Sequence, residues 1–143
     1  MYCSSLNNIV IPEGVTEIGQ EAFAVYYLNS PIGQESLVLP ESVETIGENA
    51  FAGHRFETVE VKGNLKELGY NGLGEVGNTK EENGMCTLGN ILLAYHADEK
   101  NVVVPDGITC IAGRTFAKKS MVSITIPEGV TVISTGTFER CGA

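Results

Sequence analysis

The stretch Ile9-Val-Ile-Pro-Glu-Gly-Val-Thr-Glu-Ile-Gly-Gln-Glu-Ala-Phe23 decides the fold, because the chain repeats it. Further copies begin at Leu37, Val102 and Ile124, and a more divergent copy begins at Val59. Each copy places its apolar residues at the same positions. Such self-similarity is typical of a repeat protein, in which one small structural unit stacks on the next.

Within one copy, the order of residues predicts a strand, a corner, a second short strand and a final turn. Ile9 and Ile11 alternate with other residues, so both side chains point to one face of a strand. Pro12 cannot donate to a strand ladder and ends that strand. The Glu-Gly pair that follows predicts a turn, and the last four residues predict a helical turn that places Phe23 in the interior.

The spacing between copies sets the length of one coil. From Phe51 to Val59 and from Phe116 to Ile124 the distance is 8 residues, so these coils repeat every 22 residues. A coil of that length cannot bury its own apolar face, whereas stacked coils can. The sequence therefore predicts a right-handed, β-rich α/β solenoid of about five coils of roughly 22–28 residues, with one hairpin interruption.

The pattern L-x-x-I-x-I-P-x-x-V-x-x-I-G-x-x-A-F resembles the bacterial BspA-like class of leucine-rich repeats. The resemblance runs from Cys3-Ser-Ser-Leu6 to Phe138-Glu-Arg-Cys141. It implies a leucine-rich-repeat fold and a non-catalytic role in protein–protein interaction or adhesion, at the cell surface or in a secreted protein. The implied partner is a host or matrix protein. The alternative is a structural spacer or stalk, or a self-assembling module without a ligand of its own.

The repeats define a single domain over residues 1–143, and both ends of the chain cut through a coil. No polar cap closes either end, which predicts a fragment of a longer solenoid or self-association through the coil ends at Leu6–Ile11 and Ile124–Phe138. No secretory signal opens the chain, so the expectation is an excised domain, with a cytoplasmic protein as the alternative. The expected coils span about 1–23, 24–51, 52–73, 102–116 and 117–143, with an insertion at 74–101.

Two stretches depart from the template. Residues 24–36 lengthen the first gap and carry Tyr26 and Tyr27, which predicts either a binding loop or an extra turn of helix packed on the flank. Residues 74–84 are polar and glycine-rich, and we expect them to be disordered. After them, Cys86–Tyr95 predicts a hairpin that turns at Gly89-Asn90.

Charge and hydropathy exclude several classes of partner. The net charge is −9, which argues against nucleic acid and anionic lipid surfaces. No apolar run approaches the length of about 18 residues that a membrane span needs. The sequence thus predicts a protein partner rather than a nucleic acid or a membrane.

No sequence motif predicts a catalytic, cofactor or metal site once its residues are assigned to positions of the repeat. Gly72-Leu-Gly-Glu-Val-Gly77 matches a dinucleotide-binding pattern, but Leu73 fills the phenylalanine position of its coil and no helix is predicted to follow. The four cysteines lack C-x-x-C spacing, so we expect free thiols, mostly buried, and no zinc. His54 takes the same coil-end position as Cys141, which predicts a packing role. His96 has no nucleophile that the pattern places beside it, so no catalytic residue, metal or cofactor is predicted.

Two rows of residues are candidate binding features. An acid follows the corner proline in four coils, at Glu13, Glu41, Asp106 and Glu128. This acidic corner predicts a solvated turn, with a calcium ion or a basic protein patch as the alternative. The second row, here called the outward row, consists of first-strand residues that point away from the core, and it is either a binding surface or an ordinary sheet face. Its members are Asn8, Val10, Ser36, Val38, Thr58, Glu60, Asn101, Val103, Ser123 and Thr125.

Overall fold

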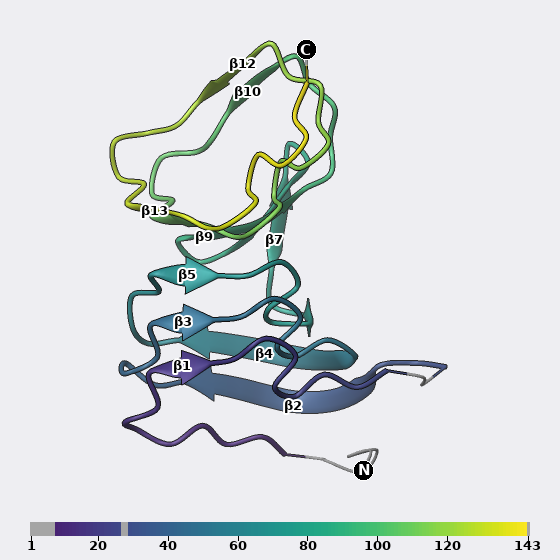
Figure 1. The fold of residues 1–143 in the computed structure, drawn as a ribbon, viewed down its shortest axis with the longest axis vertical. Helices are drawn as coiled ribbons and strands as arrows, with labels where there is room; N and C mark the ends of the chain where they lie inside the picture. The colour runs from purple at the N-terminus through teal and green to yellow at the C-terminus, as the bar shows by residue number, and fades with distance from the viewer. Residues whose placement is uncertain (1–7, 27–28, 143) are drawn as a thin grey trace. The chain divides into compact units, whose positions relative to one another are not determined.

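The computed structural model describes residues 8–26 and 29–142. The chain divides into two compact units, Met1–Asn78 (unit 1) and Thr79–Ala143 (unit 2), and each is described by itself. Both are built from coils whose strands pair with those of the neighbouring coil (Figure 1). The predicted solenoid is therefore present within each unit.

Unit 1 contains two parallel sheets, of orders β1-β3-β5 and β2-β4-β6. The first sheet collects the short second strands, and the second sheet collects the longer first strands β2 and β4 together with the two-residue β6. Thr45 pairs with Glu67, 22 residues later, as the coil length predicts. The strands are β1 (Glu17–Ile18), β2 (Ile32–Leu39), β3 (Thr45–Ile46), β4 (His54–Val61), β5 (Glu67–Leu68) and β6 (Glu75–Val76).

Unit 2 contains a two-stranded parallel sheet, β10-β12, and a five-stranded sheet of order β13-β11-β9-β8-β7. The pairs β7–β8 and β8–β9 are antiparallel, whereas the pairs of β11 with β9 and β13 are parallel. The strands are β7 (Lys80–Glu82), β8 (Met85–Leu88), β9 (Ile91–Tyr95), β10 (Asn101–Val103), β11 (Cys110–Ile111), β12 (Ser123–Thr125) and β13 (Val132–Ile133).

The core follows the apolar positions of the template. In unit 1, Phe23 and Phe51 stack with ring centroids 5.0 Å apart and ring planes at 5°. In unit 2, Phe116 stacks on Phe138 at 5.7 Å and 8°, and Tyr95 contacts the other side of Phe116 at 5.3 Å. The predicted ladders of like residues are confirmed, and Tyr95 of β9 takes the place of a phenylalanine.

The α/β assignment was wrong, because no helix occurs within residues 8–26 and 29–142. The residues before each phenylalanine form a β-turn, as where the Ala22 N–H donates to the Gly19 carbonyl at 3.2 Å. The third residue of each turn is left-handed, which defines a type II turn and cannot continue a right-handed helix. The values of φ are 57° at Glu21, 56° at Asn49, 52° at Asn71, 57° at Arg114 and 74° at Gly136.

The segment expected to be disordered is ordered, because residues 74–84 contain β6 and β7. Asn83 and Gly84 join β7 to β8 with φ of 50° and 76°, the two positive values of a type I′ turn. This Asn-Gly pair is the strongest short-range hairpin signal in a sequence, and the sequence analysis missed it. The predicted hairpin at Gly89-Asn90 is confirmed, since Leu88 pairs with Ile91 across the β8–β9 turn.

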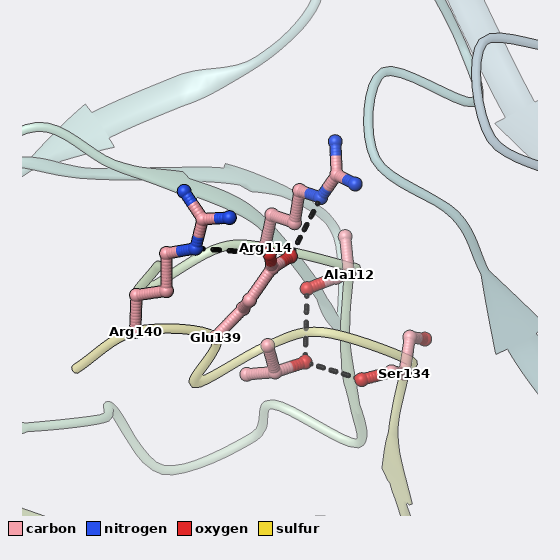
Figure 2. A network of polar contacts seen from close by, with 6 residues as sticks. Ala112, Arg114, Ser134, Glu139 and Arg140 are labelled. Carbon is pink, nitrogen blue, oxygen red and sulfur yellow. Dashed lines mark hydrogen bonds and ion pairs between the residues drawn. The ribbon is translucent and has the colours of Figure 1, made fainter. Parts of the chain in front are cut away.

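Polar contacts fasten the last two coils of unit 2 to each other (Figure 2). Arg114 Nε lies 3.2 Å from Glu139 Oε2, and Arg140 Nε lies 3.7 Å from Glu139 Oε1. Inside the coils, the buried Thr137 hydroxyl donates to the Ser134 carbonyl at 2.6 Å and lies 3.3 Å from the Ala112 carbonyl. The Thr137 hydroxyl thus reaches backbone carbonyls of its own coil and of the preceding one, which explains a polar residue at this buried position.

Candidate binding surface

The outward row is exposed at all ten positions. In unit 1 the pairing of β2 with β4 sets Ser36 beside Thr58 and Val38 beside Glu60. In unit 2 the pairing of β10 with β12 sets Asn101 beside Ser123, whose hydroxyl donates to the amide oxygen of Asn101 at 2.9 Å. The period-2 alternation therefore places the row residues of β2, β4, β10 and β12 on one face of each sheet, whereas Asn8 and Val10 precede β1 and lie in no strand.

Three valines stand out on this face. Val10 is 73% exposed, Val103 is 65% exposed and Val38 is 39% exposed. Each of them lines a hollow: Val10 and Val38 line one of about 280 Å³ in unit 1, and Val103 lines one of about 490 Å³ in unit 2. Apolar side chains that face solvent in a hollow are the feature of the outward row best suited to contact with another molecule.

The acidic corner is exposed in both units. Glu13 and Glu41 lie in unit 1, and Asp106 and Glu128 lie in unit 2. Over residues 8–26 and 29–142, no group of three or more His, Cys, Asp or Glu side chains is arranged to hold a metal ion.

The two histidines occupy different environments. His54 is buried, its Nε2 lies 2.8 Å from the Phe23 carbonyl, and its ring stacks on Phe56. Because a carbonyl oxygen accepts, the proton of His54 is on Nε2, and the buried Nδ1 has no partner among the described residues. His96 is exposed and its Nε2 lies 3.7 Å from Glu81 Oε1.

The coil-end position has one function in both units. Cys141 Sγ lies 2.8 Å from the Phe116 carbonyl, just as His54 Nε2 reaches the Phe23 carbonyl. Each side chain follows the phenylalanine of its own coil by three residues and bonds the phenylalanine carbonyl of the preceding coil. His54 is therefore a packing residue, as its position in the repeat predicts.

We expect His54→Ala to lower the free energy of unfolding by about 2–3 kcal/mol, because it removes a buried ring and leaves the Phe23 carbonyl without a donor. Cys141→Ala at the same repeat position is the control. It removes an exposed side chain and is expected to cost less than about 1 kcal/mol. Urea titration followed by far-UV circular dichroism measures both. Equal losses would contradict the proposed difference in packing.

Among the described residues, Cys86, Cys110 and Cys141 form no disulfide. Cys110 is buried, Cys86 is half-buried and Cys141 is exposed, so the expectation of mostly buried thiols holds for two of these three. Burial raises the pKa of the Cys86 thiol, which lowers its reactivity at neutral pH. Cys3 lies outside the described residues.

The described residues of the insertion, 24–26 and 29–36, contain no helix, and its last part enters β2, which begins at Ile32. Tyr26 is 44% exposed. The pKa of its phenol is raised, first by desolvation, then by a hydrogen bond with Glu21 and by the charges of Glu21 and Glu48. Tyr27 lies outside the described residues.

These stacked coils, with their ladders of like residues, define a leucine-rich-repeat solenoid. The chain belongs to the family described as the BspA type leucine rich repeat region, which matches residues 1–71 and 25–143 in six copies. No curated protein matches the sequence. Over residues 8–26 and 29–142, no helix is long and apolar enough to cross a membrane.

One solved structure that is similar is that of a leucine rich cell surface protein from Faecalibacterium prausnitzii A2-165. It is 21% identical in sequence, with a TM-score of 0.44. The match covers 97% of this chain and 40% of that chain, so this chain spans less than half the length of that protein.

Proposed function

We propose that the chain is a non-catalytic protein-binding module of a bacterial surface or secreted protein, and that the outward row is its binding surface. The observation that carries the proposal is the exposure of all ten row residues, with valines in a hollow of each unit. Membership of a repeat family supports it, because stacked repeats build extended surfaces suited to protein contact. A host or matrix protein is the proposed partner.

The proposal predicts that a charge placed on a row valine will abolish binding. Val38→Lys and Val103→Lys are expected to weaken binding to a matrix protein at least about tenfold, because burying a charge in the interface costs more than the apolar contact it replaces. Surface plasmon resonance against a panel of purified extracellular matrix proteins measures the affinity. Val122→Lys is the control, since Val122 is 74% exposed but lies outside the row.

A second candidate is a self-assembling or spacer module without a ligand. The observation that favours it is the apolar surface of the last coil, where Ile133 is 49% exposed and Phe138 is 36% exposed. Under this alternative no matrix protein binds, or the row variants leave binding unchanged. Association that rises with concentration in sedimentation, and falls in Phe138→Glu, would favour self-assembly. If the chain stays monomeric at high concentration, a spacer function is the remaining candidate.

A further inference from the structure

Strand β10 of unit 2 has one unpaired edge. Within the described residues it pairs with β12 alone. The Val104 N–H donates to Thr125 O at 2.9 Å, and the Lys100 carbonyl accepts from the Ser123 N–H at 3.1 Å. Because backbone groups alternate in direction along a strand, the N–H and C=O groups of Asn101 and Val103 point away from β12.

The end of the unpaired edge borders the hollow of unit 2, because Val103 lines this hollow and Asn101 does not. Strand β11, in the same coil as β10, lies between β13 of the next coil and β9. Since β12 and β13 both belong to that next coil, the free edge of β10 lies on the side of β9 and the β7–β8 hairpin. The hollow of about 490 Å³ lies there, and Val103 and the corner residues Pro105–Ile108 form one of its walls.

The hairpin forms the opposite wall. Lys80 pairs with Thr87 and Glu82 with Met85 across β7 and β8, so these four side chains share one face. All four line the hollow. Residues of the β7–β8 hairpin and Val103 of β10 thus line the same hollow.

The charged residues that line the hollow favour binding of a positively charged side chain. Lys80 Nζ and Glu82 Oε2 are paired at 3.0 Å and balance each other. Asp106 also lines the hollow, and no ion pair to it is found among the described residues. With one positive and two negative groups, the hollow keeps one uncompensated negative charge, and the net charge of −9 adds to its attraction for basic segments.

We propose that this hollow binds an extended segment of a partner protein, which adds a strand to the free edge of β10 and pairs a Lys or Arg with Asp106. The N–H and C=O groups of Asn101 and Val103 supply the ladder, as in other recognition by strand addition. Val103 packs against an apolar side chain of the segment. The inference rests on the proposed function and names the class of partner segment for unit 2.

The probe is a capped, fluorescein-labelled peptide, Ser-Ile-Thr-Ile-Lys-Gly, which copies residues 123–126 and adds the basic residue. Fluorescence polarisation is expected to show saturable binding to the full chain. Asp106→Asn, and separately a peptide with Glu in place of its Lys, are each expected to weaken binding about tenfold, because a charge-assisted bond is lost.

The decisive variant is Val103→Pro, which removes the Val103 N–H, one of the two free-edge donors, and no donor of the β10–β12 ladder. It is expected to weaken peptide binding at least about tenfold, whereas Val103→Thr keeps the donor and retains binding. Should Val103→Pro unfold, a peptide N-methylated at the amides that face β10 tests the same bonds. Peptide binding should also slow hydrogen exchange at the amides of Asn101 and Val103.

Unchanged peptide affinity in Val103→Pro, absence of peptide binding, or unchanged exchange at Asn101 and Val103 would overturn the inference. So would dimerisation that Val103→Pro abolishes without any binding of the peptide, since a second copy would then be the occupant. Peptide binding at β10 without binding to any matrix protein would support the inference and contradict the proposed function. Matrix binding that Val38→Lys abolishes and Val103→Pro does not would support the function and overturn the inference.

Discussion

The variant Phe51→Ala is expected to lower the free energy of unfolding by about 3–5 kcal/mol, the range for removing a fully buried aromatic ring. Phe51 has no exposed surface in unit 1. Its ring stacks on Phe23 at 5.0 Å and meets Phe56 edge-on at 5.7 Å. Truncation therefore opens a cavity in the middle of a ladder and removes two ring contacts at once.

Phe138→Ala is the matched control for Phe51→Ala, because it removes the same residue from the same repeat position. Phe138 is 36% exposed and stacks on one neighbour, Phe116, at 5.7 Å. We expect the free energy of unfolding to fall by about 1–2 kcal/mol, since folding buries less apolar area at Phe138 than at Phe51. Urea titration with far-UV circular dichroism compares the two variants. Losses of equal size would show that the phenylalanine ladder is not what holds the coils together.

Much of the architecture could be predicted because it follows from the spacing of apolar residues. The alternation at Leu37 and Leu39 put both side chains in the core, and the 22-residue spacing set Leu37 beside Val59. A stack of identical units has one way to bury a repeated apolar face. For the same reason the outward row was found at exposed positions, since it is the opposite side of the same strands.

The spacing of apolar residues could not exclude the predicted helical turn before each phenylalanine. A glutamate at Glu21 and an arginine at Arg114 favour helices, yet both residues have φ of 57° in a type II turn. Tertiary stacking decides here, because N–H groups within and directly after the turn donate to the next coil, as Glu21 does to Glu48 and Phe23 to Ala50. The same repeat position holds Asn49, Asn71 and Gly136. Asparagine and glycine tolerate a positive φ, so these residues could have predicted the turn from the sequence.

The hollow of unit 2 could not be predicted from the sequence, because the spacing of apolar residues does not describe the feature that forms it. It exists because the β7–β8 hairpin and the corner that follows β10 line the same space. The Asn83-Gly84 pair could have predicted the hairpin turn, but not which strand edge the hairpin would face. A contact between segments that do not repeat is a tertiary property, so the sequence pattern alone could not place it.

Replacing a glycine where two coils approach each other is expected to have the other large effect. Gly47 follows the buried Ile46, and a Cβ at this position would contact the Gln20 nitrogen of the first coil and lie 2.8 Å from its Cα. Backbone atoms cannot move aside as the end of a side chain can. We therefore expect Gly47→Ala to lower the free energy of unfolding by about 3 kcal/mol, at the upper end for overpacking.

Gly19→Ala separates this close approach from the general effect of adding a methyl group to a glycine. Gly19 has the same repeat position in the first coil, but no atom of the described residues lies within 4 Å of the Cβ it would gain. The free energy of unfolding of Gly19→Ala should stay unchanged or rise by up to about 1 kcal/mol, because alanine restricts the conformations of the unfolded chain. Thermal and urea unfolding of both variants tests this. A loss in Gly19→Ala as large as in Gly47→Ala would mean that the glycine is required by its backbone conformation, and that the contact between coils is not the cause.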